Sequence, residues 1–437
     1  MHRTTERRGG VVPSVRVFLL PAVVGGGLGD IDEVLTAGWY LSRKKLPVAL
    51  FRGPGRPFPP GTTGPWDWPK HQRLTHLGRS SEWALTVSAG WGVVAAPARP
   101  EPYGRAGPWS EEAREIERLY GPERTIHVSF EEFARTLTSR EQTVERWREG
   151  GVSQAEIRRR ISGKNGASEV ATFHREYAKF RGFQRPNVVH LFTTFRFSRP
   201  FASEFPHAVQ TGPLWPRFPA SPPLRQRGLS GDTDWIWYAS PSTADRLLPR
   251  VLRSLARHTG GLCLWYRTPR GKPPSAAASL RVLNQMQPTK VWRNRFVRAR
   301  VRIVTGSRTL LEAIQLGAPF LYFNGVTGRG RSARRHRPEK IRSLLSVWKS
   351  RGVSAELRRD LDLFSRGRAV DSVVRRASHR VGAWGRFPRF LPVEGFQAPY
   401  DSASDLLWAL VSRMTAEAPE AASIVREVRS GVLKLSP

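Results

Sequence analysis

The chain has 437 residues, too many for one ordinary hydrophobic core, so two domains are expected. Its formal net charge of +35 and pI near 11.5 exclude a highly acidic, salt-adapted protein. A basic surface favours anionic partners, such as nucleotide phosphates, nucleic acid or acidic lipid head groups. Arginine supplies 61 of the 71 basic residues, and the surplus is spread along the chain, which indicates a general compositional bias with local basic patches.

The single cysteine, Cys263, excludes a disulfide within the chain and fits a reducing compartment. No spacing of cysteine and histidine is typical of zinc ligands, so we predict no metal site. No apolar run reaches the roughly 18 residues that span a bilayer. A basic start followed by an apolar stretch resembles a signal peptide, but Arg16 interrupts the stretch. We therefore expect a first β-strand there, with a signal peptide as the alternative.

Strand and helix patterns alternate through the first half of the chain. We expect strands at residues 15–20, 47–52, 85–94, 125–130, 187–195 and 208–212, and helices at residues 31–45, 110–119, 131–148 and 153–180. Ser110 and Ser153 are the expected amino-terminal caps of two of these helices. A glycine-rich loop at residues 25–30 separates the first strand from the first helix. This strand–loop–helix–strand order indicates a parallel sheet.

The second half repeats the alternation after a proline-rich linker at residues 213–231. We expect strands at residues 234–239, 261–266, 301–305 and 320–323, and a short helix or turn at residues 280–287. We expect helices at residues 240–258, 338–351, 354–363, 401–415 and 419–433, and one more that begins after Ser307 or Thr309 and ends before Gly317. The fold class is therefore α/β, with two doubly wound, Rossmann-like domains facing each other. The expected domains are residues 1–220 and 221–385, and the helices within residues 386–437 can pack back on the first domain.

The most informative pattern lies at residues 301–325, where a strand leads through Gly306 into an amphipathic helix. Ser307 or Thr309 is expected to cap this helix. A helix amino terminus fed by a small-residue turn favours phosphate, because its free N–H groups and its dipole attract an anion. Glu312 lies farther along, where its carboxylate can reach a sugar hydroxyl beside that phosphate. The alternative is an ordinary βαβ unit with a solvated Glu312.

This segment resembles the nucleotide-sugar-binding unit of GT-B glycosyltransferases, in the group that contains the lipid-linked peptidoglycan N-acetylglucosaminyltransferase. The resemblance rests on six residues in order: Gly306, Ser307, Thr309, Glu312, Gly317 and Pro319. It implies the GT-B fold, a donor ribose held by Glu312, and a donor diphosphate held by the turn with Arg308. No cofactor is implied, because the nucleotide diphosphate sugar is the substrate.

Three further segments are donor-site candidates, because ligands bind at the carboxyl ends of parallel strands. Residues 240–243 open a helix after a strand and either bind phosphate or simply cap that helix; the candidates are Ser240, Ser242 and Thr243. Arg267 follows the next strand and can neutralise a departing diphosphate. In the basic run at residues 327–340, the resemblance assigns contacts with the donor sugar to His336, Glu339 and Lys340. A solvated basic loop and a membrane contact are the alternatives there.

On the acceptor side, the glycine loop of the first half corresponds in position to a loop of GT-B enzymes; its glycines include Gly26, Gly27 and Gly29. Several of those families carry a catalytic histidine at the end of this loop, where the present chain has Asp30. A carboxylate can accept a proton from an acceptor hydroxyl. It can equally cap the following helix. Asp32 and Glu33 are the adjacent alternatives for a catalytic base.

The sequence therefore predicts a glycosyltransferase that moves a sugar from a nucleotide-activated donor to an acceptor hydroxyl. No metal is predicted, because no Asp-x-Asp pair lies at a strand end. The expected partners are a nucleotide sugar, an acceptor that the sequence does not identify, and an anionic membrane surface. We expect a cytoplasmic protein, with peripheral binding to the inner face of the membrane left open. The alternatives are a nucleotide-sugar 2-epimerase on the same fold, a non-catalytic GT-B protein and, ranked lower for lack of a motif, a nucleic-acid-binding protein.

Overall fold

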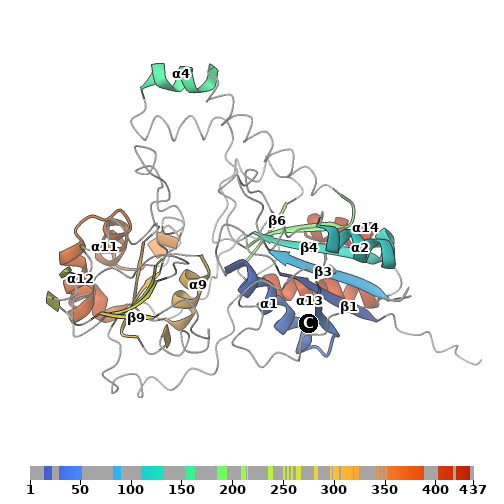
Figure 1. Cartoon of the computed structure of the whole chain (residues 1–437), viewed down its shortest axis with the longest axis horizontal. Coiled ribbons are helices and arrows are strands. Elements are labelled where there is room, and N and C mark those ends of the chain that lie inside the picture. Colours follow the sequence, from blue (N-terminus) through green and yellow to red (C-terminus); the bar gives the residue numbers. More distant parts are fainter. Residues whose placement is uncertain are drawn as a thin grey trace, which may run out of the picture.

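The computed structural model describes about half of the chain in scattered segments. These are residues 14–21, 29–51, 82–89, 110–131, 153–162, 185–193, 208–212, 214, 235–239, 250, 253–254, 257–258, 262–266, 280–283, 296–297, 299–304, 307–317, 319–323, 341, 344–345, 348–349, 352–387, 402–416 and 420–433. Within them, the chain forms two units, each built on one parallel sheet (Figure 1). The expected helix at residues 131–148 and nearly all of the expected linker at residues 213–231 lie outside the described part.

The first unit holds a six-stranded sheet in the order β2-β1-β3-β4-β5-β6, in which all neighbours are parallel. Its strands are β1 (Val15–Leu20), β2 (Val48–Leu50), β3 (Trp83–Ala89), β4 (Thr125–Glu131), β5 (Val188–Thr193) and β6 (Ala208–Thr211). Its helices include α1 (Gly29–Ser42), α2 (Glu111–Tyr120) and the short η1 (Pro122–Arg124), and farther along the chain comes α4 (Gln154–Ser162). Strand β3 is buried along its whole length, as expected when helices cover both faces of a parallel sheet.

Alternate residues of the central strands pack against different helices. Val17 and Leu19 belong to a core that also contains residues of α1, α13 (Ala403–Thr415) and α14 (Ala421–Arg429). Phe18, between them, packs on the other face with residues of α2. The last two helices of the described chain therefore lie on the first sheet, where Figure 1 draws them in red beside the blue and cyan strands.

The second unit holds a five-stranded parallel sheet in the order β11-β10-β7-β8-β9. Its strands are β7 (Trp235–Ala239), β8 (Leu262–Tyr266), β9 (Leu280–Leu283), β10 (Val301–Val304) and β11 (Phe320–Tyr322), and its helices include α9 (Ser307–Leu316), α11 (Ala355–Ser365), α12 (Val370–His379) and the short η6 (Gly382–Arg386). The core is rich in aromatic side chains, with Trp235, Trp237, Phe320 and Trp384 all essentially inaccessible.

Three details of the second unit differ from the expectations. Residues 280–283 form the edge strand β9, so the expected helix or turn there is wrong; pairing with β8 decides a short segment whose pattern is ambiguous. The helix α12 has no counterpart among the expected elements, because Ala369 precedes it in the left-handed conformation and no side chain caps it. Helix α9 begins at Ser307, which places both Ser307 and Thr309 within its first turn, so neither is the cap that was expected.

Both sheets reverse the direction in which strands are added. In the first sheet, β2 and β3 lie on opposite sides of β1, and in the second, β8 and β10 lie on opposite sides of β7. Such a reversal opens a crevice at the carboxyl edge of a parallel sheet, where ligands bind. Each unit is thus a doubly wound α/β structure, and the predicted fold class is confirmed. Helix α1 follows β1 and helix α9 follows β10, so both begin beside a reversal point.

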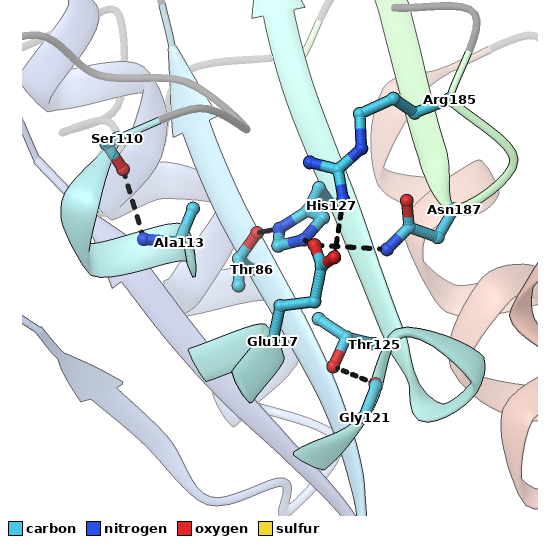
Figure 2. Close-up of polar contacts among 9 residues, drawn as sticks. All are labelled: Thr86, Ser110, Ala113, Glu117, Gly121, Thr125, His127, Arg185 and Asn187. Atoms are coloured by element: carbon cyan, nitrogen blue, oxygen red, sulfur yellow. Dashed lines mark hydrogen bonds and ion pairs between the residues drawn. The ribbon is translucent and has the colours of Figure 1, made fainter. Parts of the chain in front are cut away.

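The amino-terminal cap predicted for α2 is present, and its contribution to stability can be measured. The Ser110 hydroxyl accepts a hydrogen bond of 3.1 Å from the backbone N–H of Ala113 (Figure 2). Ser354 occupies the same position before α11 but makes no such bond. We expect Ser110→Ala to lower the free energy of unfolding by about 1 kcal/mol, and Ser354→Ala to lower it by clearly less. Urea unfolding followed by circular dichroism measures both, and equal losses would contradict the assigned cap.

Candidate functional site

Helices α1 and α9, which begin beside the two reversal points, meet between the units (Figure 1). Asp32 lies in the first turn of α1, and Arg308 is the second residue of α9. The Arg308 Nε donates a hydrogen bond of 2.6 Å to Asp32 Oδ2 across 276 positions of sequence. The contact brings the start of the predicted acceptor-side helix next to the start of the predicted donor-side helix.

The Arg308 guanidinium directs all three of its nitrogens at the first unit. Besides the bond to Asp32, Nη2 donates to Thr36 Oγ1 and Nη1 donates to the Leu214 carbonyl oxygen, each at 2.6 Å. Arg308 is only 5% exposed, and the adjacent carboxylate offsets the cost of burying its charge. Arg308 therefore links the two units, a role that the sequence did not predict. Arg308 could make its predicted contact with the donor diphosphate only by giving up some of these three hydrogen bonds.

Glu312 lies on the same side of α9 as Arg308, because the two are four positions apart in a helix. Its side chain is buried, with 3% of the residue exposed, so the alternative of a solvated Glu312 is wrong. Leu310 and Leu311 pack into the core of the second unit and hold the helix against its sheet. The buried carboxylate of Glu312 is thus carried on a rigid element near the junction of the units.

The surroundings of Arg308 include a tyrosine and a further acidic residue. Burial raises the pKa of the Tyr40 hydroxyl, and the positive charge of Arg308 acts in the opposite direction. Asp405 of α13 also raises that pKa, which places the start of a C-terminal helix close to the same junction. Glu33, one of the predicted alternatives for a base, is buried at 2% exposure on α1.

The structure describes some of the predicted site residues only by their backbone. Gly29 and Asp30 open α1, which puts Asp30 in the first turn, where a carboxylate suits the helix dipole. Ser307 opens α9. The other predicted residues lie outside the described part of the chain: Gly26, Gly27, Ser240, Ser242, Thr243, Arg267, Gly306, His336, Glu339 and Lys340. Their roles remain predictions.

The strand order nevertheless relates the predicted donor segments to one another. Four adjacent strands, in the order β11-β10-β7-β8, end at one edge of the second sheet. Each of these strands precedes one predicted donor segment: the basic run at residues 327–340, the turn at Gly306, residues 240–243 and Arg267. The sequence predicts that each segment follows a strand, but it does not predict the order of the strands in the sheet. The pairing of β10 with β7 makes these four strands neighbours.

A second polar cluster lies on the first sheet and was not predicted (Figure 2). The Glu117 carboxylate of α2 accepts a hydrogen bond of 2.8 Å from Nε2 of neutral His127 on β4, and Nδ1 of that ring lies 2.7 Å from the Thr86 hydroxyl. Arg185 and Asn187 donate to the same carboxylate. The hydrogen bond from His127 lowers the pKa of Glu117 to about 2, although burial opposes the change.

His127 itself is inaccessible, and burial lowers its pKa, so the ring stays neutral as this hydrogen-bond pattern requires. The ring sits near the amino end of β4, away from the edge where ligands bind to parallel sheets. We conclude that the cluster fastens α2 to the sheet. No short motif joins these residues in the sequence, which is why sequence patterns missed them.

Metal and membrane features were also sought among the described residues. In that part of the chain, no three histidine, cysteine, aspartate or glutamate residues are grouped as metal ligands would be. Likewise, none of the helices assigned there combines the length and apolar character needed to cross a membrane.

Comparison with known proteins gives structural likeness only. No protein-family model matches the chain, and no curated protein matches its sequence. Among solved structures, the glycosyltransferase SnogD from Streptomyces nogalater is 14% identical over 92% of this chain and 100% of its own, with a TM-score of 0.40. A UDP-glucosyltransferase from Polygonum tinctorium is 10% identical over 97% and 99%, with a TM-score of 0.40. The wall teichoic acid polymerase TagF is 12% identical over 93% and 89%, with a TM-score of 0.41.

At such identities and with TM-scores below 0.5, these matches assign no activity to the chain. The fold class rests on the strand order of the molecule itself, which is the doubly wound arrangement that the GT-B resemblance implies for each unit. The chain is a two-unit α/β protein whose reversal-point helices α1 and α9 are joined by Arg308 and Asp32.

Proposed function

We propose that the chain is a glycosyltransferase that moves a sugar from a nucleotide-activated donor to an acceptor hydroxyl. The observation that carries the proposal is the strand order β11-β10-β7-β8, because each of these neighbouring strands precedes one predicted donor segment. Residues that follow adjacent parallel strands converge at one edge of a sheet. The sequence resemblance to GT-B enzymes at residues 301–325 supports the same site.

In this proposal, the amino end of α9 binds the donor diphosphate. The helix is ten residues long, so its dipole and free N–H groups stabilise negative charge as the nucleoside diphosphate departs. Glu312 holds the donor ribose, and its burial strengthens hydrogen bonds from sugar hydroxyls to the carboxylate. Helix ends and basic side chains do this work without a metal or another cofactor.

Asp30 is the proposed catalytic base on the acceptor side. Asp32 is the weaker candidate, because its carboxylate accepts a hydrogen bond from Arg308 and its charge is balanced there. Asp30 lies two positions earlier in the same first turn of α1. The formal charge of +35 supports peripheral contact with an anionic membrane surface as part of the proposal.

Replacing Glu312 with glutamine tests the donor site, because glutamine keeps the shape of the buried side chain and removes its charge. We expect one nucleoside diphosphate to raise the melting temperature of the natural protein, since a ligand at about 100 times its Kd stabilises the folded state by about 2.7 kcal/mol. Glu312→Gln should lose most of this rise while melting at nearly the same temperature without ligand. Differential scanning fluorimetry with a panel of nucleotides and nucleotide sugars measures both quantities.

Gln315→Ala, on the same helix, is the matched control and should keep the full rise. An unchanged rise in Glu312→Gln would remove the proposed ribose contact. Equal rises with every polyanion, RNA included, would mean that the protein responds to charge alone and that the transferase proposal is wrong.

A further inference from the structure

A basic pocket of about 470 Å³ lies in the second unit, away from the predicted donor edge. Its lining residues are Arg250, Arg253, Ser254, Arg257, Gly367, Ala369, Val370, Asp371 and Ser372. The lining residues between Arg250 and Arg257 are helical and precede β8, so they lie near the amino edge of the sheet. The predicted donor segments instead follow the carboxyl ends of the strands. The pocket is therefore distinct from the proposed donor site.

Three arginines form one wall of the pocket. Arg250, Arg253 and Arg257 are spaced three and four positions apart, which places them on one face of a helix. Arg250 and Arg253 are exposed and make no ion pair with any residue in the described segments, and Arg257 lies 3.6 Å from Asp371. Like charges on one helix face repel each other, so an anion bound between them would stabilise this wall.

The opposite wall contains the amino end of α12. This helix has ten residues, and no side chain caps it, so its first N–H groups are available to an anion. Asp371, in the first turn, is the one acidic group among the described residues that line the pocket, and it also lies 3.5 Å from His258 Nε2.

A buried hydroxyl gives a second and independent sign of a ligand. Ser254 is only 2% exposed and lines the same pocket, and its Oγ has no hydrogen-bond partner of normal geometry among the described residues. The interaction of its hydroxyl with Asp371 is the largest cause of the lowered pKa of that carboxyl, but the two groups do not reach normal hydrogen-bond geometry, so the hydroxyl remains poorly satisfied. A buried hydroxyl without a partner is unfavourable, and a ligand oxygen in the pocket would supply one.

We propose that this pocket binds a small ligand through a phosphate group that carries two or more negative charges. Three guanidinium groups against one carboxylate, with a helix amino terminus opposite, match such a group in charge and in hydrogen-bond donors. The volume lies within the roughly 300–1,000 Å³ of small-molecule sites and exceeds what a lone phosphate fills. The phosphate can come from a soluble phosphorylated molecule or from a lipid head group.

Isothermal titration of the full chain with pyrophosphate tests the proposal. We expect the double variant Arg250→Gln/Arg253→Gln to bind at least tenfold more weakly than the natural protein. The control Arg359→Gln/Arg426→Gln removes the same charge from exposed positions of α11 and α14 and should bind as the natural protein does. Asp371→Asn removes the one opposing charge found among the described lining residues and should tighten binding severalfold.

Pyrophosphate can also enter the predicted donor site, so the titrations are repeated in Ser307→Asp, which places a negative charge at the amino end of α9 and should repel a diphosphate there, while binding by the pocket should remain. Equal losses in the two double variants, or no detectable binding, would overturn the proposal. Co-sedimentation with phosphatidylcholine vesicles that contain phosphatidic acid identifies the source. Binding that depends on Arg250 and Arg253 assigns the phosphate to a lipid head group, and pyrophosphate binding alone assigns it to a soluble molecule.

Discussion

Arg308→Met is expected to lower the free energy of unfolding by about 3 kcal/mol, because it removes the buried partner of an ion pair together with two further hydrogen bonds of the guanidinium. The variant would leave the Asp32 carboxylate, the Thr36 hydroxyl and the Leu214 carbonyl without the donor that now satisfies all three. It would also remove a polar tie between the two units. Urea unfolding measures the stability, and small-angle scattering measures whether the radius of gyration grows.

Two further variants separate the buried link from a general effect of losing an arginine. Arg366→Met breaks an exposed pair with Asp362 on the surface of α11 and should cost at most about 1 kcal/mol. The double variant Arg308→Met/Asp32→Leu removes both charges and should recover part of the stability lost in Arg308→Met. If Arg308→Met lowers the free energy of unfolding no more than Arg366→Met does, the link between the units contributes little to stability.

Stability is expected to fall steadily as the pH is lowered below about 6.5, because buried histidines of the first sheet must stay neutral. Burial lowers the pKa of His190 on β5 to about 3 and also lowers that of His127 on β4. The unfolded chain takes up protons on both rings below pH 6.5, and the folded chain does not. The stability that comes from keeping these rings neutral is therefore fully present above pH 6.5, and it is lost as the pH falls toward the pKa values of the folded protein.

A histidine whose folded pKa lies well below the pH, as that of His190 does, contributes a slope of about 1.4 kcal/mol per pH unit to the free energy of unfolding. His190→Leu should reduce the slope between pH 6 and pH 4 by about that amount, whatever its effect on stability at neutral pH. His379→Gln changes an exposed histidine of α12 and should leave the slope as it is. Glu117, with its pKa lowered to about 2, adds a further loss below pH 4.5. A slope unaltered in His190→Leu would show that His190 is already protonated in the folded protein.

The fold was predictable from the sequence because its signals are local. Apolar runs such as Val15–Leu20 and Trp235–Ala239 indicate buried parallel strands, and Ser110 marks the start of α2. The failures occur where the deciding interaction is distant or carries no side-chain signal. Strand β9 exists because β8 pairs with it, and α12 begins at an alanine without a capping side chain.

The candidate site shows the same division. The turn before α9 and the position of Glu312 could be predicted, because a strand, a small-residue turn and a helix lie next to each other in the sequence. The partners of Arg308 could not, because Asp32 is 276 positions away and no periodic pattern connects them.

The position of α13 and α14 affects the order in which the two units can fold during synthesis on the ribosome. The apolar face that these helices cover belongs to strands between Val15 and Thr211, whereas the core of the second unit is assembled from residues between Trp235 and Phe387. A ribosome therefore completes the second core before it has made the helices that close the first. Domains usually fold from the amino terminus as synthesis proceeds. Here one apolar face of the first sheet stays uncovered, and able to bind chaperones, until α13 and α14 have been synthesised.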